Sequence, residues 1–416
     1  MSSFSIFRLF LVVLVFSIGA SGGMVLTNAQ DVGADVGGGA GIFRPRNPET
    51  KRRTARTSTP TVRRSTASRG TTTTPTTATS AADAERIEDL LEKGNEFRDA
   101  RRFAEAEDSY QSVLKLKPRD SRASYGLGNV YADQQRWEEA ENAYRNAVQG
   151  PSDVDALVAL SVVLVQPRTG AGNAKRLADA EMFARRALQL QPKNAVAWDR
   201  LGVALQARGI FSEETERSYR RAVELDPEFA VAYAHLARVL NKRGRAQEAA
   251  PLYVKAAALA KDPATLNLVA ESLQAEQQWE NSEPILKRAL QLDARNPNAL
   301  YLLGRMLVVY KRYQEAEPHL KLATEVSQKA FQPFYLLGRT YLALERYEEA
   351  EVTYERAAGL ASAGDRKDLS GAFGFEGVGD GYMKAKKKPS AARAYKRALE
   401  LDPANKQLEQ KWDRAR

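Results

Sequence analysis

The residues able to carry out chemistry are few in this chain. It has two histidines, His235 and His319, and no cysteine. A catalytic site needs a nucleophile, a base or a metal ligand with a partner at workable geometry. The two histidines are too far apart in sequence for a metal-ligand motif. We therefore expect both to be packing or surface residues, and we predict no metal, no other cofactor and no enzyme activity.

Two glycine-rich stretches and two pairs of glutamates favour structural interpretations. Residues 170–175 lack the Gly-Lys-Ser/Thr ending of a phosphate loop, and they follow an expected helix rather than a strand. Residues 374–381 have the wrong order of glycines for a dinucleotide fingerprint. Glu138-Glu139 and Glu348-Glu349 stand at expected helix starts, where the helix dipole favours carboxylates. We expect residues 170–175 to form an inserted turn and residues 374–381 to belong to a loosened final repeat. We expect the two glutamate pairs to begin helices.

The elements that must position these side chains follow a repeat. A small residue in one amphipathic segment is followed, usually nineteen positions later, by alanine in a second segment. Successive members of the first column lie 34, 33, 41, 35, 33, 34, 34 and 41 residues apart, and a period near 34 indicates a repeat array. The first column is Gly94, Gly128, Ser161, Gly202, Ala237, Ala270, Gly304, Gly338 and Gly379; the second is Val113, Ala147, Ala187, Ala222, Ala256, Ala289, Ala323, Ala357 and Ala398.

Small residues in both columns let two helices cross closely, while larger neighbours fill the groove. The pattern Trp-x-x-Leu-Gly, then Ala-x-x-x-Tyr-x-x-Ala, then Pro, occurs for example at 198–202, at 350–357 and at Pro403. It resembles the tetratricopeptide repeat family over about three quarters of the chain. The resemblance implies an all-α, right-handed solenoid of about nine helix pairs. Departures from the pattern are Val113, Thr215 and Ser282, which stand where the family prefers alanine.

The repeats set the expected domain boundaries. The solenoid is predicted over 81–403, and residues 404–416 are predicted to form a polar capping helix that covers the end of the stack. The third unit carries about seven extra residues at 167–173. A similar excess lies within 359–371, before the ninth unit, and one interpretation of it is a hinge.

In the resembled family, first helices line a concave groove, and ligands meet positions just before and after the small residue. The motif Tyr-Leu-Leu-Gly-Arg at 301–305 recurs at 335–339. Arginine offers a planar fork for carboxylates and tyrosine offers stacking area, so we predict a site for an extended or helical peptide with acidic and aromatic groups. The alternative is that these tyrosines pack between helices and the arginines are solvated. The candidate groove residues are Arg122, Tyr125, Asn129, Arg238, Asn241, Asn298, Tyr301, Arg305, Gln332, Tyr335 and Arg339.

Some members of that family hold the free carboxylate of a chaperone in a Lys/Asn clamp. Asn95 and Asn129 are present here, but Leu91 and Gly126 stand where the clamp has Lys and Asn. The sequence does not favour a chaperone clamp.

The first 29 residues have the profile of a signal peptide. Arg8 precedes the apolar run 9–20, and Thr27-Asn28-Ala29 offers a small-x-small cleavage pattern. Residues 9–26 acting as an uncleaved inner-membrane anchor are the alternative. We therefore predict an exported protein, periplasmic or secreted.

Residues 30–80 are predicted to form a disordered linker. Of the forty residues 41–80, thirteen are Thr and nine are Lys or Arg, and Glu49 alone is acidic, which gives +8. Residues 1–40 sum to −1, so about +3 of the total +10 remains for 81–416. The linker is a tether in the simplest interpretation. Its charge also suits an anionic envelope surface, which we favour over nucleic acid for an exported protein.

These features predict a non-catalytic scaffold or adaptor that binds a protein or peptide partner outside the cytoplasm. Two alternatives stay open. One is an envelope assembly factor docked by the basic linker, and the other is a regulatory subunit of a separate enzyme. The sequence identifies neither the partner nor the oligomeric state, nor whether the Thr-rich linker is glycosylated.

Overall fold

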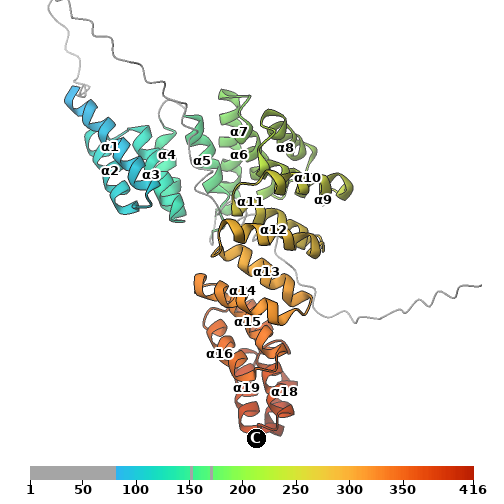
Figure 1. Ribbon diagram of the computed structural model, residues 1–416. Helices are drawn as coiled ribbons and strands as arrows, with labels where there is room; N and C mark the ends of the chain where they lie inside the picture. Colours follow the sequence, from blue (N-terminus) through green and yellow to red (C-terminus); the bar gives the residue numbers. More distant parts are fainter. Residues whose placement is uncertain (1–80, 150–152, 169–171) are drawn as a thin grey trace, which may run out of the picture.

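The computed structural model describes residues 81–149, 153–168 and 172–416. Within these ranges every regular element is an α-helix, α1 to α20. The predicted all-α solenoid is confirmed (Figure 1). The predicted signal peptide and linker lie outside the described residues, as do Gly170 and Ala171 of the glycine-rich stretch.

Nine helix pairs make up most of the described chain, and each pair packs on the next. The first helices are α1 (Ala81–Asp99), α3 (Ser121–Asp133), α5 (Val154–Leu164), α7 (Ala195–Ala207), α9 (Ala230–Lys242), α11 (Pro263–Ala275), α13 (Pro297–Val309), α15 (Phe331–Ala343) and α18 (Phe375–Lys384). The second helices are α2 (Phe103–Leu116), α4 (Trp137–Ala147), α6 (Asn173–Leu190), α8 (Glu213–Leu225), α10 (Ala246–Leu259), α12 (Trp279–Leu292), α14 (Tyr313–Val326), α16 (Tyr347–Ala358) and α19 (Lys388–Leu401).

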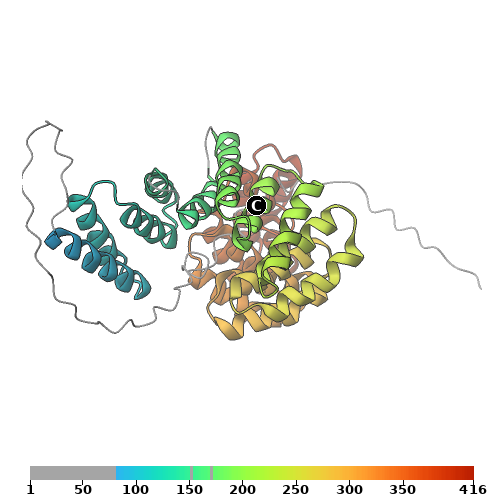
Figure 2. The same cartoon turned by 90° about the horizontal axis from the view of Figure 1, so that it is seen from above.

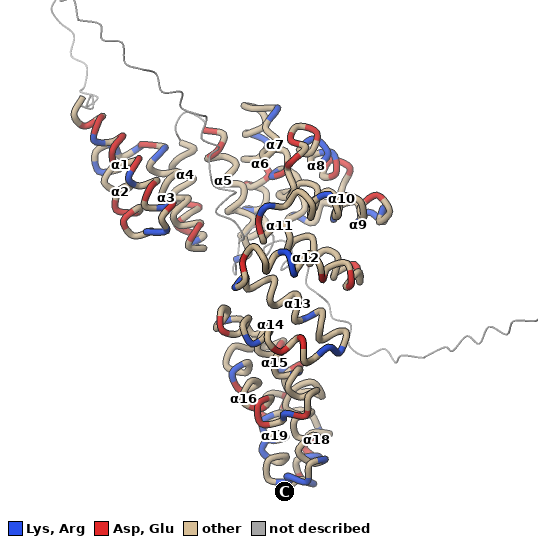
Figure 3. The backbone as a smooth tube through the Cα atoms, in the orientation of Figure 1, with Lys and Arg blue, Asp and Glu red and all other residues tan. Residues whose placement is uncertain are grey.

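The pairs follow a curved path. Helices α1 to α4 form an arm at one end, and α14 to α19 lead down to the C-terminus (Figure 1). Seen from above, the helices between these ends curve round in an arc (Figure 2). Both acidic and basic residues are spread along the described path, as Figure 3 shows.

The small columns mark the predicted close crossings. A Cβ built on Gly202 of α7 would lie 2.5 Å from Cε1 of Tyr219 in α8, and one on Gly94 would lie 2.7 Å from Cε1 of Tyr110. These distances are far below ordinary carbon contacts of about 3.5–4.0 Å. At these two crossings the ring therefore occupies the space that a side chain in place of the glycine would need. All nine residues of the second column have no exposed surface.

The same crossing fixes the residue that follows the glycine. Tyr110 Oη donates to Asn95 Oδ1 at 2.8 Å. Tyr144 Oη donates to Asn129 Oδ1 at 2.7 Å, and Tyr395 Oη donates to Asp380 Oδ1 at 2.6 Å. A buried hydroxyl without a partner is costly, so this bond lets tyrosine fill the core at the crossing.

The turn inside most pairs needs one residue in the left-handed region. Gly209 and Gly244 supply it with φ of 76° and 78°. Other units place a residue with a side chain there, and the strain is then borne by a non-glycine residue. These residues, with φ between 57° and 63°, are Arg101, Gln135, Gln277, Lys311, Glu345 and Lys386.

An arginine ladder ties neighbouring second helices together. Its members are Arg136, Arg245, Arg312 and Arg346, each standing just before a second helix and bonding a glutamate 29 residues earlier. Arg312 Nη1, for example, lies 2.8 Å from Glu283 Oε2. Each also pairs with a glutamate three residues later. Each rung therefore crosses one boundary between units.

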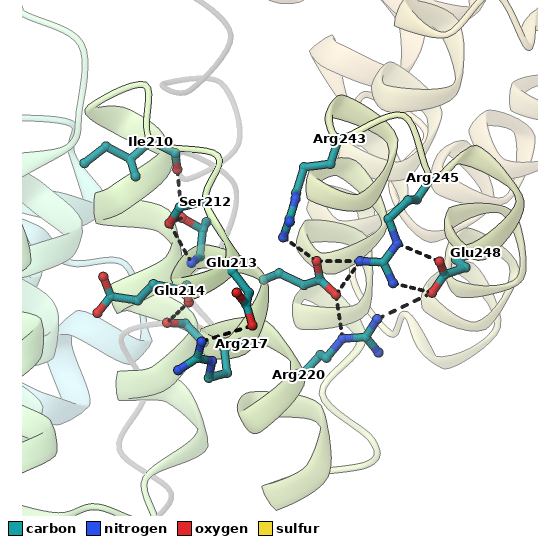
Figure 4. A network of polar contacts seen from close by, with 12 residues as sticks. Ile210, Ser212, Glu213, Glu214, Arg217, Arg220, Arg243, Arg245 and Glu248 are labelled. Carbon is teal, nitrogen blue, oxygen red and sulfur yellow. Dashed lines mark hydrogen bonds and ion pairs between the residues drawn. The ribbon is translucent and has the colours of Figure 1, made fainter.

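The rung between α8 and α10 is the most elaborate (Figure 4). The Glu216 carboxylate accepts from Arg220 at 2.8 Å, from Arg243 at 2.6 Å and from Arg245 at 2.8 Å. Arg245 also bonds both oxygens of Glu248. The side chain of Glu216 is 8% exposed, so these arginines offset its burial.

The ladder has no rung between α10 and α12 in the described structure. Gln278 stands where the arginine would be, and Ala249 stands 29 residues before it. The link here is Arg288, whose guanidinium donates to the carbonyl oxygens of Ala257 and Ala260 at the end of α10. The two larger hydrophobic clusters also meet here, because α11 contributes buried residues to both.

Two further helices complete the fold. The extra residues before the ninth unit contain α17 (Ala363–Ser370), which opens with a capping box between Ser362 and Asp365. The segment is thus partly helical and packs on α19 through an element that the repeat period did not predict. The predicted C-terminal cap is α20 (Lys406–Ala415), which buries Leu408 against α19.

Candidate functional site

In the seventh unit, the guanidinium of one arginine lies near two aromatic rings. The Arg305 guanidinium lies 5.5 Å from the ring centroid of Tyr301 and 5.6 Å from that of Trp279. Its Nε and Nη2 donate to Oε1 of Gln274 at 3.0 and 2.7 Å. Tyr301 and Arg305 are one helical turn apart on α13, so both point to the same face.

The side chain of Gln274 is itself held by the hydrogen bonds of its amide nitrogen. Its Nε2 donates to the carbonyl of Leu302 and to Oγ of Ser282, both at 3.1 Å. Gln274 is almost fully buried. Arg305 is therefore held by two hydrogen bonds to α11, and its head group also lies within 6 Å of two aromatic rings.

The eighth unit repeats the arrangement with other partners. The Arg339 guanidinium lies 5.9 Å from the ring centroid of Tyr335 and 4.5 Å from that of Phe373. Tyr335 stacks on Phe331, with ring centroids 5.4 Å apart and planes inclined by 17°. Phe373, from the segment between α17 and α18, is 60% exposed. We call Trp279, Tyr301, Arg305, Tyr335, Arg339 and Phe373 the Tyr–Arg surface.

The two arginines of this surface lack carboxylate partners. Both are half-buried, yet within the described ranges neither forms an ion pair. Arginines of the ladder, by contrast, have two glutamates each. Burial raises the pKa of Tyr335, with the Arg339 charge opposing this and Asp368 adding to it. The surface therefore presents two positive charges beside apolar rings.

The candidates of the second unit are engaged within the solenoid. Arg122 donates to both oxygens of Glu88, at 2.8 and 2.9 Å, and to Asp120. Tyr125 packs with its ring centroid 5.8 Å from that of Tyr144, and burial raises its pKa to about 12. Asn129 is buried, where it accepts the Tyr144 hydroxyl bond described above.

The remaining candidates differ in exposure. Arg238 and Asn241 of α9 are half-buried, whereas Asn298 and Gln332 are exposed near the starts of α13 and α15. Burial raises the pKa of Glu276, and hydrogen bonds from Tyr253 and Asn241 oppose that effect. Asn241 thus lies beside a carboxylate of the next unit, and the two exposed amides are free to meet a ligand.

The structure brings only part of the candidate set together. Helices α9, α11, α13 and α15 contact one another in succession. Helix α3, with the second-unit candidates, lies in the arm at the other end (Figure 1). The candidates of the seventh and eighth units therefore form one surface, while Arg122, Tyr125 and Asn129 belong to another part of the molecule.

Sequence reasoning did not assign Gln274, Trp279, Phe331 or Phe373 to the site. Trp279 is the first residue of a second helix, and Phe373 lies between the extra residues 359–371 and the glycine-rich stretch 374–381. The repeat pattern alone does not reveal that either residue lies next to an arginine of a neighbouring helix.

His235 is a packing residue, as expected, but it belongs to a buried charged cluster. Its Nδ1 lies 2.8 Å from Oδ1 of Asp199, and Arg200 Nη2 lies 3.3 Å from Oδ2 of the same carboxyl. Burial raises the pKa of Asp199, but the charges of His235 and Arg200 outweigh it and the net pKa is lowered. All three side chains are at most 3% exposed, which leaves no room for a substrate.

Other surfaces offer less chemistry. No three His, Asp or Glu side chains in the described ranges lie where they could hold a metal ion. None of the helices α1 to α20 is long and apolar enough to cross a membrane. An open hollow of about 450 Å³ lies on α6, lined by residues that include Met182, Arg185 and Arg208. Both of these arginines pair with Glu181, so their guanidinium groups are already engaged within the fold.

Comparisons with known proteins agree with this architecture. The tetratricopeptide repeat profile matches residues 91–164, and the profile of anaphase-promoting complex, cyclosome, subunit 3 matches 242–323 and 278–357. No curated protein sequence matches the chain.

Solved structures with a similar fold include the human IFIT1 dimer with m7Gppp-AAAA (15% identity, 77% of this chain, 81% of that chain, TM-score 0.45). Another is a thermophilic repeat protein of Thermus thermophilus (22% identity, 45% and 99% coverage, TM-score 0.39). A third is the APC/C hetero-tetramer Cut9–Hcn1 (15% identity, 79% and 76% coverage, TM-score 0.40). These likenesses concern the fold alone.

Proposed function

The chain belongs to the tetratricopeptide repeat family, and on that basis we propose that it is a non-catalytic scaffold that binds a peptide segment of a partner protein. The segment binds the Tyr–Arg surface and carries acidic and aromatic side chains. A fold of stacked helix pairs supports protein–protein interaction by presenting a long surface.

One observation carries this proposal. Arg305 and Arg339 are half-buried beside aromatic rings and lack an ion-pair partner in the described chain. A guanidinium that is partly removed from water gains from a carboxylate, because charge-assisted bidentate bonds are among the strongest in proteins. The rings at its sides also suit an apolar or aromatic group of the same ligand.

The exposed amides extend the surface. Asn298 and Gln332 occupy equivalent positions 34 residues apart, before the two tyrosines. Each amide has a donor and an acceptor, and a ligand backbone offers both. We propose that these two side chains bond the main chain of the peptide, while the arginines bind its acidic side chains.

The site of action is a separate proposal that rests on the sequence of residues 1–80. Residues 1–29 direct export and are then removed, and residues 30–80 tether the solenoid or contact an anionic envelope surface. Mass determination of the mature N-terminus together with cell fractionation tests this proposal. A mature chain that begins at Met1 in the cytoplasm would refute export.

Capture of the partner in the protein's own cells tests the scaffold proposal. Site-specific cross-linkers at Asn298 and Gln332 should capture the same polypeptide, and Arg305→Ala with Arg339→Ala should abolish capture. The matched control is Arg356→Ala. Arg356 lies 5.8 Å over the Phe334 ring and forms no ion pair in the described chain, but it belongs to the second helix α16.

The outcomes separate clearly. Unchanged capture by the double variant would refute the Tyr–Arg surface as the binding site. Loss of capture in the Arg356→Ala control as well would show a general effect of removing surface arginines. Circular dichroism of each variant checks that the solenoid is intact.

A further inference from the structure

We propose that Gln274 is a positioning residue of the Tyr–Arg surface. Its amide oxygen holds one edge of the Arg305 guanidinium and leaves the other edge for a ligand carboxylate. The inference rests on the proposed function, and it adds the residue that orients the arginine and the edge on which the ligand binds. It follows from the hydrogen bonds that Gln274 and Arg305 make.

The hydrogen bonds of Arg305 occupy one edge of its guanidinium. A guanidinium carries five N–H donors in a fixed plane, one on Nε and two on each Nη. Nε and Nη2 of Arg305 both donate to Oε1 of Gln274, at 3.0 and 2.7 Å. The donors on Nη1 and on the outer side of Nη2 bond no other residue of the described chain. They form the terminal edge of the group, which can bind both oxygens of a carboxylate.

Gln274 orients this arginine without neutralising it, because its amide carries no charge. The side chain is 1% exposed, and its Nε2 donates to the carbonyl of Leu302 and to Oγ of Ser282, both at 3.1 Å. The amide oxygen is therefore a fixed acceptor for Arg305. Much of the conformational entropy of the arginine side chain is lost before a ligand arrives, and binding does not have to remove it again.

The eighth unit lacks this arrangement. Val308 stands 31 residues before Arg339, as Gln274 stands 31 residues before Arg305. Valine has no side-chain acceptor, and no hydrogen bond joins the Arg339 side chain to another residue within the described ranges. Its guanidinium lies 4.5 Å from the ring centroid of Phe373 instead. The amide contact is therefore particular to Arg305 and is not a requirement of the repeat.

Two substitutions separate orientation from charge. Gln274→Met keeps a side chain of similar size but removes the oxygen that Arg305 bonds. Gln274→Glu keeps an acceptor and adds a negative charge, because at pH 8 a carboxyl group beside a guanidinium is ionised, and the charge of Arg305 is then cancelled. The matched control is Gln206→Glu. Gln206 is buried at the equivalent position of α7, but it accepts from Tyr219 rather than from an arginine.

The first measurement needs no ligand. With isotope labelling of arginine Nε atoms, the NMR signal of Arg305 is the one that Arg305→Ala removes. The Nε hydrogen of Arg305 should exchange with water about tenfold more slowly in the wild type than in Gln274→Met, because only the wild type bonds it to a fixed acceptor. Equal exchange rates would overturn the inference. Urea unfolding followed by circular dichroism checks that each variant is folded.

The second measurement is peptide binding to the full chain. The probe is the tightest peptide from a displayed random library that the wild type keeps and Arg305→Ala loses. Fluorescence anisotropy should show roughly three- to tenfold weaker binding to Gln274→Met, from the lost pre-organisation, and about tenfold or greater weakening in Gln274→Glu. Gln206→Glu should bind as the wild type does.

The carboxylate of the probe is identified in the same assay. A synthetic probe with a C-terminal amide has carboxylates only on its side chains. Changing its acidic residues to amides, one at a time, should find a residue whose change weakens binding to the wild type but not to Gln274→Glu. A probe that binds only with a free C-terminus would also support a carboxylate on Arg305, and it would place that carboxylate at the chain end.

The outcomes distinguish two failures. Affinity that neither Gln274 variant changes, or peptides that depend on Arg339 alone, would overturn this inference and leave the proposed function standing. An equal loss in Gln206→Glu would overturn it as well, because the loss would then come from any buried charge in the solenoid. Selection of peptides that depend on neither arginine, or of none, would overturn both.

Discussion

Replacing Gly202 by alanine tests whether the small columns are set by contact with the tyrosine ring. On helix propensity alone the change should stabilise α7 by about 1 kcal/mol. The new Cβ, however, would lie 2.5 Å from two carbons of the Tyr219 ring, which has no exposed surface and cannot swing into solvent. Overpacking of a core costs about 1–3 kcal/mol. We therefore expect a net loss of up to about 2 kcal/mol, the overpacking cost less the gain in propensity.

Urea unfolding followed by far-UV circular dichroism measures this loss, and a double-mutant cycle identifies its cause. Tyr219→Ala alone should cost about 3–5 kcal/mol, as other large-to-small core changes do. With the ring removed, Gly202→Ala should no longer be harmful, so the double variant should be more stable than the two single losses predict.

Gly209→Ala is the control for the cycle, because its Cβ has no neighbour within 4 Å and its cost comes only from φ of 76°. That cost should be independent of Tyr219. A Gly202→Ala variant that is more stable than the wild type, or strictly additive with Tyr219→Ala, would refute the reasoning.

Three further predictions concern stability. Lys311→Gly relieves a left-handed residue with φ of 58° and should raise the thermal midpoint by the equivalent of about 0.5 kcal/mol, since relief of strain exceeds the entropic cost of glycine; a lower midpoint would contradict this. The hydrogen bond from Arg312, with that from Lys287, lowers the pKa of Glu283 from 4.5 to about 2. The stability that the ionised Glu283 carboxylate contributes is therefore fully present above pH 4.5 and is lost as the pH falls toward 2. Glu283→Gln should reduce the loss of unfolding free energy on acidification by at most about 1 kcal/mol. An unchanged loss below pH 4.5 would count against a stabilising Arg312–Glu283 pair. Asp199→Leu leaves a buried guanidinium without its carboxylate and should cost about 3–5 kcal/mol in urea unfolding, whereas a near-neutral result would show that Arg200 finds water.

Much of the fold follows from the sequence because each unit obeys one local rule. Gly94, Gly202 and Gly338 must be small where a ring crosses, and that requirement recurs with the period of the unit. Helix α17 could not be predicted in this way. It occurs once, outside the period, and its start depends on a capping box between Ser362 and Asp365 rather than on the repeat.

The candidate site is less predictable for a related reason. The repeat places Tyr301 and Arg305 on one face of α13, and their equivalents on α15, because the spacing within a helix fixes the face. It does not say which side chain of another unit reaches that face. Gln274 bonds Arg305 across 31 residues, and Phe373 reaches Arg339 from the segment between α17 and α18, which has no counterpart in other units.

The same limit explains the second-unit candidates. Asn129 holds the repeat position of Arg305, but a tyrosine of α4 donates to it, so it is part of the core. Residues at equivalent positions of the repeat thus lie on the same face of their helices but differ in the contacts they make. The partner of each one is set by the neighbouring unit, and that partner changes along the chain.

The missing rung between α10 and α12 has a mechanical consequence. A solenoid loaded at its two ends yields first where its units are least firmly linked, and between α10 and α12 the described chain has Arg288 on carbonyl oxygens and Tyr253 Oη on Glu276 in place of a ladder rung. This joint would let the first five units swing as a lever against the later units, in which α11, α13 and α15 contact one another in succession. We therefore expect amide hydrogens of α11 to exchange faster than those of α9 and α13, and equal rates in all three would rule the joint out. Movement of the N-terminal units would then leave the shape of the Tyr–Arg surface unchanged.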